Sequence, residues 1–497
     1  MSESFVKKTL ARLLIPALLL ASLSGCAPAD VAPAPVPEAP ANPVPAQPSE
    51  TGPAEEIAAQ PMLAVEPEAG FDPYETDSAC NRMALELVLE PLFVVSETGE
   101  LRSVLAESWT VTPDGSTTQV VLRKGVTFHD GTPLTASVVA ESVNRASAGG
   151  IYSGRFYALE SVEATETDTV TFTTSKAYEC FPLLLDIPIA LTEGYLPVGT
   201  GPYEWDGTDA LQPYAGWWGE NYPAGECAVA LQEVRNAEQL RDGFQYGGVT
   251  GVCVDPNGSG AVHYTGEYEL WNVPGAIMQY VGFNLTKGVF SSKKLRTAVT
   301  WAVDRERIVT EDLSGFGVPA VLATLPGSVW DVPELAEGKG FDPAALTASL
   351  SSSGLNATMI VSGENAQRLI SAERIARQLS DCGIYVTVKS LPTAEFRKAL
   401  QKGEFDLYYA EARLSPSLDL SPFFAKNGSL SFGGLADAGR ESLCDLVLAN
   451  RGNSYDLQNE ILQEGLLCPV AFKTTACYLH RGVMAPLSPN LGGWLWQ

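Results

Sequence analysis

The segment "NAQRLISAERIARQLSDCGIYVTVKSLPTAEFRKALQKGEFDLYYA", residues 365–410, decides the fold class. Its first part places apolar side chains at helical spacing, and Gly383 follows where a helix end favours positive φ. Alternating residues then predict a strand from Ile384, a short helix over 394–402, and a second, apolar strand in "FDLYYA". Helix, strand, helix and strand at these lengths predict an α/β domain with an at least partly parallel sheet.

A second segment, "SWTVTPDGSTTQVVLRKGVTFHDGTPL" at residues 108–134, predicts a β-rich region. Pro113-Asp114-Gly115 is a strong turn signal between two runs rich in Thr and Val, so we expect a hairpin here. Thr135 then opens a helical pattern in which the valines share one face, and its side chain is expected to cap the free amides. We expect the β-rich region and the α/β region to be separate domains.

The first 26 residues have the layout of a secretory signal. Three basic residues precede the apolar run 13–21, which is too short to span a bilayer. Leu23-Ser24-Gly25-Cys26 resembles the lipobox of bacterial lipoproteins, which implies that residues 1–25 are removed and that Cys26 is the lipid attachment point. The alternative is an ordinary signal peptide that contains an incidental cysteine.

The residues after Cys26 divide into a tether and a long folded part. Residues 27–61 are rich in Pro and Ala without helical or strand periodicity, so they predict an extended spacer. The rest of the chain is too long for one compact core and implies two or three domains. A formal net charge of −27 argues against nucleic acid and anionic lipid surfaces as partners of the folded part.

The cysteines and histidines give no metal or redox motif. The chain has three histidines and no C-x-x-C, which argues against a structural zinc or an imidazole-rich metal site, and we expect no cofactor. An exported protein can oxidise its cysteines, but buried free thiols are the simpler interpretation, and the sequence selects no pairing. The eight later cysteines are Cys80, Cys180, Cys227, Cys253, Cys382, Cys444, Cys468 and Cys477.

No established catalytic motif occurs in the chain, so we do not expect an enzyme. The segments "PNGSGA" at 256–261 and "HDGT" at 129–132 are interpreted as turns. Trp217-Trp218 and the closing "WLW" are either core residues or surfaces on which a sugar or peptide stacks.

The segment "FDLYYAEARLSPSLDLSPFF", residues 405–424, holds the candidate site. Alternation places Tyr409, Glu411 and Arg413 on one face at the end of an apolar strand, before the chain breaks at Pro416. The carboxyl ends of strands in α/β sheets are where ligands usually bind. A solvated strand end with a surface ion pair is the competing interpretation.

Five blocks of the sequence resemble, in order, the family 5 extracellular solute-binding proteins, whose members carry oligopeptides, dipeptides or nickel. The resemblance implies two hinged lobes that close on a solute, in the class II periplasmic-binding arrangement, and a permease and ATPase as partners. We also expect a monomeric receptor that is anchored by lipid on the extracytoplasmic face of the cell membrane. The blocks are Leu89–Ala146, Val198–Tyr203, Val281–Val309, Phe341–Gly354 and Leu379–Ala410.

The resemblance also implies a domain order. Residues 1–25 are the signal peptide and 26–62 the acylated cysteine with its tether. Lobe I is discontinuous, an extra β-rich domain belongs to it, and lobe II follows. The expected ranges are 63–80 with 171–275 and 470–497 for lobe I, 81–170 for the extra domain, and 276–469 for lobe II.

One departure from the family affects the expected solute. Peptide-binding members carry a Trp followed by Ala-Asp-Tyr after the "FDL" strand, and that Asp neutralises the peptide amino terminus; here Glu411 or Asp419 would take its place. Arg413 is expected to meet a carboxylate through its two-pronged guanidinium. The solute is therefore a short peptide or a small zwitterionic or anionic molecule. A sensing lipoprotein that reuses the fold without import is the alternative function.

Overall fold

The computed structural model describes residues 60–96, 98–207, 209–219, 227–259, 261–351, 354–449 and 454–480. All of them belong to one compact unit, Ile57–Gln497. The predicted signal peptide, Cys26, nearly all of the tether and the closing "WLW" lie outside the described residues. None of the described helices has the length and hydrophobicity needed to cross a lipid bilayer.

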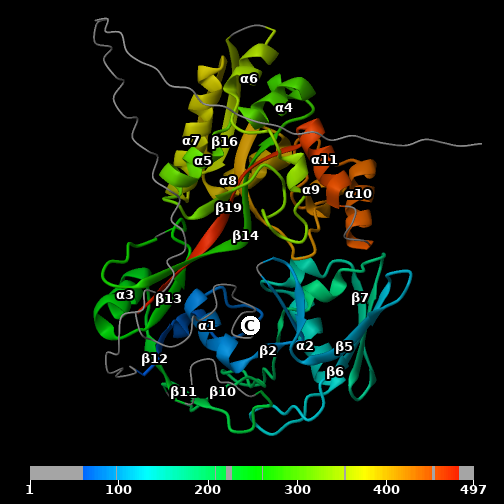
Figure 1. Cartoon of the computed structure of the whole chain (residues 1–497), viewed down its shortest axis with the longest axis vertical. Helices are drawn as coiled ribbons and strands as arrows, with labels where there is room; N and C mark the ends of the chain where they lie inside the picture. The colour runs from blue at the N-terminus through cyan, green and yellow to red at the C-terminus, as the bar shows by residue number, and fades with distance from the viewer. Residues whose placement is uncertain are drawn as a thin grey trace, which may run out of the picture. The chain divides into compact units, whose positions relative to one another are not determined.

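A four-stranded sheet forms one end of the unit (Figure 1). The strand β1 pairs in parallel with β12, and the other neighbours are antiparallel. Helix α1, Ala79–Val88, packs its buried apolar side chains into the same core as these strands, and Ser78 caps its first turn. In sheet order the strands are β1 Met62–Val65, β12 Val229–Glu233, β11 Ala210–Pro213 and β10 Tyr203–Trp205.

The β-rich region is a second four-stranded sheet, wholly antiparallel and covered by helix α2, Ala136–Ala148 (Figure 1). The predicted hairpin is confirmed: β5 and β6 pair across a turn in which Gly115 has φ 71°. The proposed cap is wrong in detail, because the Thr135 side chain makes no capping hydrogen bond. In sheet order the strands are β5 Ala106–Val111, β6 Thr117–Leu122, β8 Thr169–Thr174 and β7 Leu159–Glu166.

The α/β region forms a seven-stranded mixed sheet. The strand β16 is parallel to β17 and β18, which confirms the prediction of a partly parallel sheet, while β13, β14, β15 and β19 pair in antiparallel fashion. The predicted ends of the two helices in this region, Ala366–Asp381 and Thr393–Lys402, are also confirmed. Gly383 and Gly403 follow these helices with φ angles of 106° and 64°. The strands are β13 Gly251–Val254, β14 Glu269–Phe283, β15 Gly317–Pro319, β16 Leu355–Ser362, β17 Ile384–Leu391, β18 Leu407–Arg413 and β19 Leu467–Leu479.

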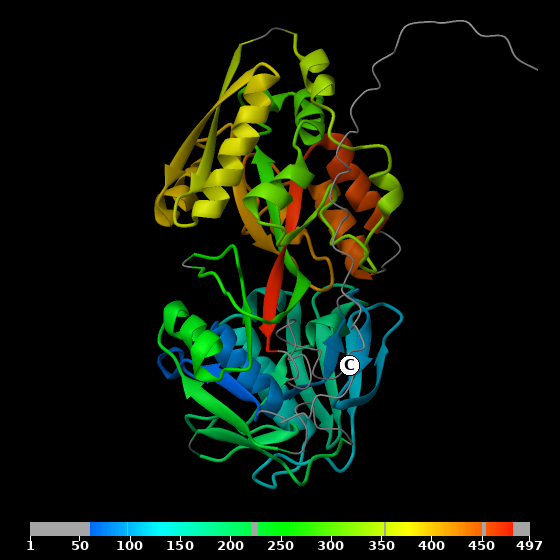
Figure 2. The same ribbon diagram turned by 60° about the vertical axis from the view of Figure 1, so that its left-hand side comes forward.

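Helices and short strands complete the described chain, and Figures 1 and 2 show α7 lying beside β16. Its buried face, including Ala372, Ile375 and Leu379, has the helical spacing expected from the sequence. The other helices are α3 Ala237–Asp242, α4 Lys293–Trp301, α5 Arg305–Arg307, α6 Pro343–Ser349, α7 Ala366–Asp381, α8 Thr393–Lys402, α9 Ser421–Phe424, α10 Ala438–Ala449 and α11 Ser454–Glu464. The strand pairs β2 Glu90–Pro91 with β9 Pro188–Ile189, and β3 Phe93–Val95 with β4 Leu101–Ser103, stand apart from the larger sheets.

The long strands β14 and β19 connect two groups of elements (Figures 1 and 2). One group holds the two four-stranded sheets with α1 and α2, and the other holds β16 with helices α4 to α11. Their pairing is interrupted by a register shift between Pro274 and Met278 of β14. The bulged backbone there leaves the ladder with β19, while Ile277 still pairs with β18, and the bulge forms part of a cavity wall. The expected lobe boundaries at residues 275 and 470 fall inside these two strands, and the division into lobes and an extra domain remains a prediction.

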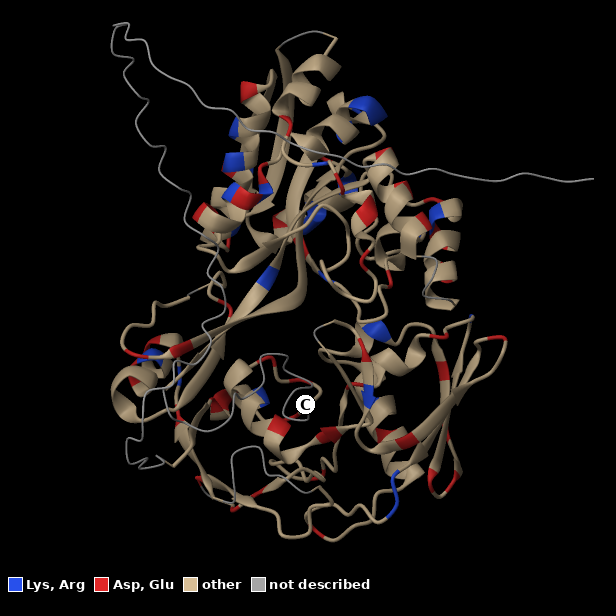
Figure 3. Cartoon of the chain, in the orientation of Figure 1, with Lys and Arg blue, Asp and Glu red and all other residues tan. Residues whose placement is uncertain are grey.

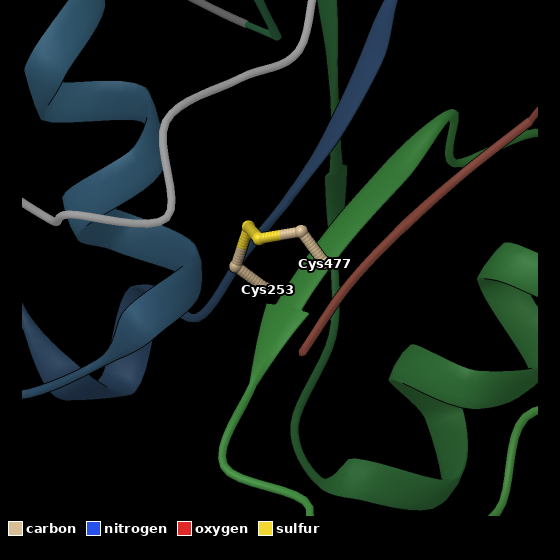
Figure 4. The surroundings of a disulfide bond; sticks show 2 residues. All are labelled: Cys253 and Cys477. Atoms are coloured by element: carbon tan, nitrogen blue, oxygen red, sulfur yellow. A yellow bond between two sulfur atoms is a disulfide. The ribbon is translucent and has the colours of Figure 1, made fainter. Parts of the chain in front are cut away.

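One disulfide joins two neighbouring strands. Cys253 on β13 is bonded to Cys477 on β19, at positions that face each other in the strand register (Figure 4). The expectation of buried free thiols is wrong for Cys253 and Cys477, whereas Cys80, Cys382 and Cys444 are buried and free as expected. The covalent bond therefore fixes β13 against β19 beside the cavity wall, because Cys253 is also a lining residue.

Candidate functional site

A cavity of about 410 Å³ lies where β14 and β19 pass between the two groups of elements. Its walls come from α1, from the 3₁₀ turn Ser153–Arg155, from the segment after β13, and from the bulge of β14. The end of β18, the segment that follows it, and β19 close the remaining sides. Segments separated by hundreds of residues thus converge on one concave space, as in ligand sites between domains.

The cavity lining is rich in cations. Arg82, Arg155, Arg413 and Lys473 contribute to it, against the two carboxylates Asp186 and Asp255. The chain as a whole carries a net charge of −27, and Figure 3 shows Asp and Glu on helices and strands throughout the described chain. A net positive cavity in so acidic a protein favours an anionic group on the ligand.

Arg413 lies at the last residue of β18, opposite Ile277 of the β14 bulge. Among the residues that the structure describes, none forms an ion pair or a side-chain hydrogen bond with its guanidinium. The side chain is exposed to the cavity, yet the pKa of Arg413 is lowered. Desolvation by the surrounding walls is the largest cause, and the positive charges of Arg82 and Arg155 add to it. Of the four site residues predicted from the sequence, Arg413 is the one that lines the cavity, and its role in ligand binding remains a prediction.

Two other cations in the lining have carboxylate partners. Arg155 forms an ion pair with Asp186 and stacks over the ring of Tyr152, with 4.9 Å between its guanidinium carbon and the ring centroid. Lys473 is buried on β19 and forms an ion pair with Asp255, which directly follows β13. Among the described residues, no carboxylate forms such a pair with Arg413.

Glu411 and Tyr409 share one face of β18, as alternation predicted, but they support the cavity from behind and do not line it. Glu411 accepts hydrogen bonds from Arg368 at 2.6 Å and Gln279 at 2.9 Å, and Lys473 Nζ lies 3.5 Å from its Oε1. Tyr409 is fully buried and donates a hydrogen bond to Gln279 at 2.8 Å. Both residues thus hold the surroundings of Lys473, and a direct role for them in ligand binding remains a prediction.

The charges around Glu411 keep it ionised. Burial by itself raises the pKa of a carboxyl group, but the charges of Lys473 and Arg368 outweigh burial, so the pKa of Glu411 is lowered. An ionised Glu411 in turn fixes the position of the Lys473 ammonium next to the cavity.

Asp419 lies away from these residues. Its carboxylate is buried and accepts a hydrogen bond from the Ser421 backbone at 2.9 Å, at the start of α9. It is not among the lining residues of the cavity. This contact is a local turn of the kind that Asp commonly makes with its own backbone, and a ligand role for Asp419 remains a prediction.

Asp255, Lys473, Arg82 and Arg155 were not found from the sequence. Asp255 directly follows the apolar strand "GVCV" and opens the turn that was recognised at 256–261, which was the available signal. The arginines lie in a helix and a short turn without any distinguishing pattern. Their convergence depends on tertiary structure.

The tryptophan pair has a partner in Glu90. The indole N–H groups of Trp217 and Trp218 donate hydrogen bonds to the Glu90 carboxylate at 3.2 and 2.9 Å, and the Thr200 hydroxyl donates one at 2.6 Å. Burial raises the pKa of Glu90 to about 7, against the opposing effect of these hydrogen bonds. Both tryptophans are half-buried, and Trp218 packs against the hydrophobic core, so the pair serves the Glu90 cluster outside the cavity.

His129 belongs to a turn, as the sequence suggested. Asp130 accepts a hydrogen bond from the Thr132 backbone at 2.9 Å, and His129 Nε2 lies 3.0 Å from the Gly201 carbonyl oxygen. Burial lowers the pKa of His129. Within the described residues, no group of three His, Cys, Asp or Glu side chains is arranged to hold a metal ion.

Comparison with known proteins extends these observations. Residues 100–429 match the family described as bacterial extracellular solute-binding proteins, family 5 Middle. The glutathione-binding protein GsiB of Escherichia coli K12 is 28% identical over 279 residues, which cover 52% of this chain and 54% of GsiB. The match thus spans about half the length of this curated relative.

Solved structures share the fold at low sequence identity. The unliganded open form of the periplasmic murein tripeptide binding protein MppA superposes with a TM-score of 0.73 at 15% identity, covering 88% of this chain and 97% of MppA. The substrate binding protein CtaP of Listeria monocytogenes gives 0.68 at 17% identity, covering 84% and 93%. The mixed α/β fold is thus the two-lobed class II fold of periplasmic binding proteins, and the chain belongs to the family 5 bacterial extracellular solute-binding proteins.

Proposed function

We propose that the protein is the solute-binding receptor of an ATP-driven importer and that it captures a small solute bearing a carboxylate, such as a short peptide. The family supplies the receptor role, and GsiB, the relative described above, is named for binding glutathione, itself a small anionic peptide. The cavity of about 410 Å³ lies within the range of about 300–1,000 Å³ typical of small-molecule sites.

Arg413 is the observation that carries the carboxylate requirement. A guanidinium at the cavity wall, beside two further arginines and with no ion pair or hydrogen bond to a described residue, is costly unless a ligand supplies an anion in direct contact. A carboxylate matches the guanidinium fork with two parallel hydrogen bonds, which a neutral ligand cannot reproduce.

Closure of the lobes would then transmit binding to the permease. The cavity walls come from both groups of elements that β14 and β19 connect, so a solute held there contacts both. Such a ligand favours the closed arrangement by its differential affinity for it, and the closed receptor is what the permease would recognise. Nothing in this cycle requires a bond of the solute to break.

Thermal shift measurements with Arg413→Met test the proposal. For the wild-type protein, a solute at a hundred times its dissociation constant stabilises the folded state by about 2.7 kcal/mol. We expect a peptide or small carboxylate in a panel to do this, and its carboxamide counterpart to bind at least about tenfold more weakly because it lacks the charge.

Arg413→Met is expected to lower the affinity for the carboxylate ligand to the affinity that the wild type has for the carboxamide. Arg377→Met, which changes an exposed arginine of α7 outside the cavity, serves as the matched control and should leave both affinities unchanged. If no carboxylate in the panel shifted the melting temperature, or if Arg413→Met bound the carboxylate like wild type, the proposal would fail.

We also propose that Cys26 anchors the receptor to the membrane through lipid. The basis is the sequence Leu23–Cys26 after an apolar run, followed by a Pro-rich tether that leaves the folded part free to meet its permease. Cys26→Ser should release the protein from the membrane fraction of the producing cells and abolish incorporation of labelled fatty acid. Retained label in that variant would refute the anchor.

A further inference from the structure

We propose that Asp255 accepts the amino group of the solute, so that the cavity selects a zwitterionic ligand with a free ammonium near a carboxylate. This inference rests on the proposed function, in which Arg413 binds the carboxylate. It differs from the expectation drawn from the sequence, in which Glu411 or Asp419 would neutralise an amino terminus.

Asp255 is the cavity carboxylate with the most open surface. It lines the cavity, and 41% of its side chain is exposed. Oδ1 accepts a hydrogen bond from the Asn257 backbone at 3.0 Å, and Oδ2 contacts Lys473 Nζ. A carboxylate offers about four acceptor positions, so it retains capacity for a ligand donor.

The competing carboxylates are more fully engaged. Asp186, which also lines the cavity, is 16% exposed and pairs with Arg155. Glu411 is 16% exposed and binds both Arg368 and Lys473, while Asp419 is buried and holds the Ser421 backbone. Neither Glu411 nor Asp419 belongs to the lining.

The segment around Asp255 is held in place before any ligand arrives. The Asn257 side chain is buried and donates to the Phe316 carbonyl at 3.2 Å, and Asn365 donates to the Asn257 carbonyl at 2.8 Å. Lys473 is held on its far side by Glu411. A carboxylate fixed in this way loses little freedom on binding, which favours affinity.

The positions of the charges specify a zwitterion. Arg82, Arg155, Arg413 and Lys473 make most of the cavity repulsive to an ammonium group, so Asp255 is the place where one is tolerated. Asp255 and Arg413 line the same cavity, and the charge of Asp255 raises the Arg413 pKa against the lowering by the walls and the other arginines. One ligand can therefore place its carboxylate on Arg413 and its ammonium on Asp255.

Calorimetric titration of one short peptide in two forms, with a free and an acetylated amino terminus, tests this inference. The peptide is the carboxylate ligand that gives the largest thermal shift with the wild-type protein. We expect acetylation to weaken binding by about tenfold or more, because a hydrogen bond to a charged group usually contributes that much to affinity. Equal affinities of the two forms for the wild type would overturn the inference without any variant being made.

Variants identify the carboxylate responsible. Asp255→Asn should reduce the affinity for the free form to that for the acetylated form, and leave the acetylated form within about twofold, because the change removes charge but little volume. A merely structural role would weaken both forms equally and would overturn the inference. Asp255→Glu keeps the charge and should retain part of the preference for the free amine.

Asp186→Asn is the rival variant, and Asp242→Asn, at an exposed position of α3, is the control. Loss of the amine preference in Asp186→Asn instead of Asp255→Asn would overturn the assignment. The two proposals fail separately: if no carboxylate ligand binds, the proposed function fails, whereas a carboxylate ligand that binds equally well with and without its amine removes only the role of Asp255.

Discussion

Glu90 is a buried acid whose environment makes stability depend on pH. It is inaccessible to solvent and lies among Thr200, Trp217 and Trp218, with Arg123 stacked on the Trp218 ring at 4.4 Å. Its pKa is raised to about 7 from an ordinary value of 4.5. The folded state therefore holds this proton up to a higher pH than the unfolded chain does.

The sign of the effect follows from proton linkage. Between pH 4.5 and 7 the folded state binds more protons at Glu90 than the unfolded state, so the free energy of unfolding falls as the pH rises. The contribution is complete below pH 4.5 and is lost above about pH 7. A shift of this size corresponds to about 3 kcal/mol.

Glu90→Gln should flatten this dependence. The difference in free energy of unfolding between wild type and variant, measured with urea, is expected to change by about 3 kcal/mol from pH 5 to pH 8, in favour of the variant at high pH. Because both proteins share all other titrating groups, the difference isolates Glu90. A difference that stays constant across this range would contradict the raised pKa.

Single residues also show how far the sequence determines the site. Arg413 was identified because alternation along one apolar strand fixes where a strand end points. Asp255 was not, because its partner Lys473 lies 218 residues away and its exposure depends on a wall built from several elements. The same limit applies to Glu411: its face was correctly predicted, but its partners Arg368 and Gln279 were not.

Among the elements, the pairing of β14 with β18 depends on a glycine. Gly282 lies opposite Tyr408 in the register, and a Cβ at Gly282 would stand 2.1 Å from the Tyr408 ring. Tyr408 is fully buried and packs edge to face on Tyr280 and Phe405, so its ring has no room to move aside.

Gly282→Ala is therefore expected to destabilise the protein by about 1–3 kcal/mol or more through overpacking. Gly340→Ala is the control, because a Cβ at that position meets no atom within 4 Å, and it should stay within about 0.5 kcal/mol of wild type. Urea unfolding of both variants measures the effect. Equal stabilities of the two would show that the Tyr408 ring adjusts freely.

Local patterns predicted the elements better than their connections. Turn chemistry, periodicity and spacing act over short distances along the chain. They predicted the hairpin at Gly115, the ends of α7 and α8, and the parallel pairing of β16. The disulfide between Cys253 and Cys477 joins residues 224 positions apart, so only the register of β13 against β19 selects it. Thr135 precedes its helix as predicted, but its side-chain direction depends on packing.

At the scale of the whole molecule, an acidic chain surrounds a cavity lined by four cations. The two long strands that pass this cavity connect the elements on either side of it, so any solute bound there acts on both (Figure 2). Net negative charge elsewhere favours repulsion between copies of the folded part, while the cavity supplies the local attraction for an anion. Capture of a carboxylate-bearing solute is therefore the central claim of this account.

Native mass spectrometry of protein purified gently from its own producing cells tests that claim most directly. The account predicts one bound small molecule per chain, carrying at least one carboxylate when it is released and fragmented, and its loss in Arg413→Met prepared in parallel. The Arg377→Met control should retain it. A neutral or purely cationic solute, or the same solute retained at the same occupancy by Arg413→Met, would contradict the account.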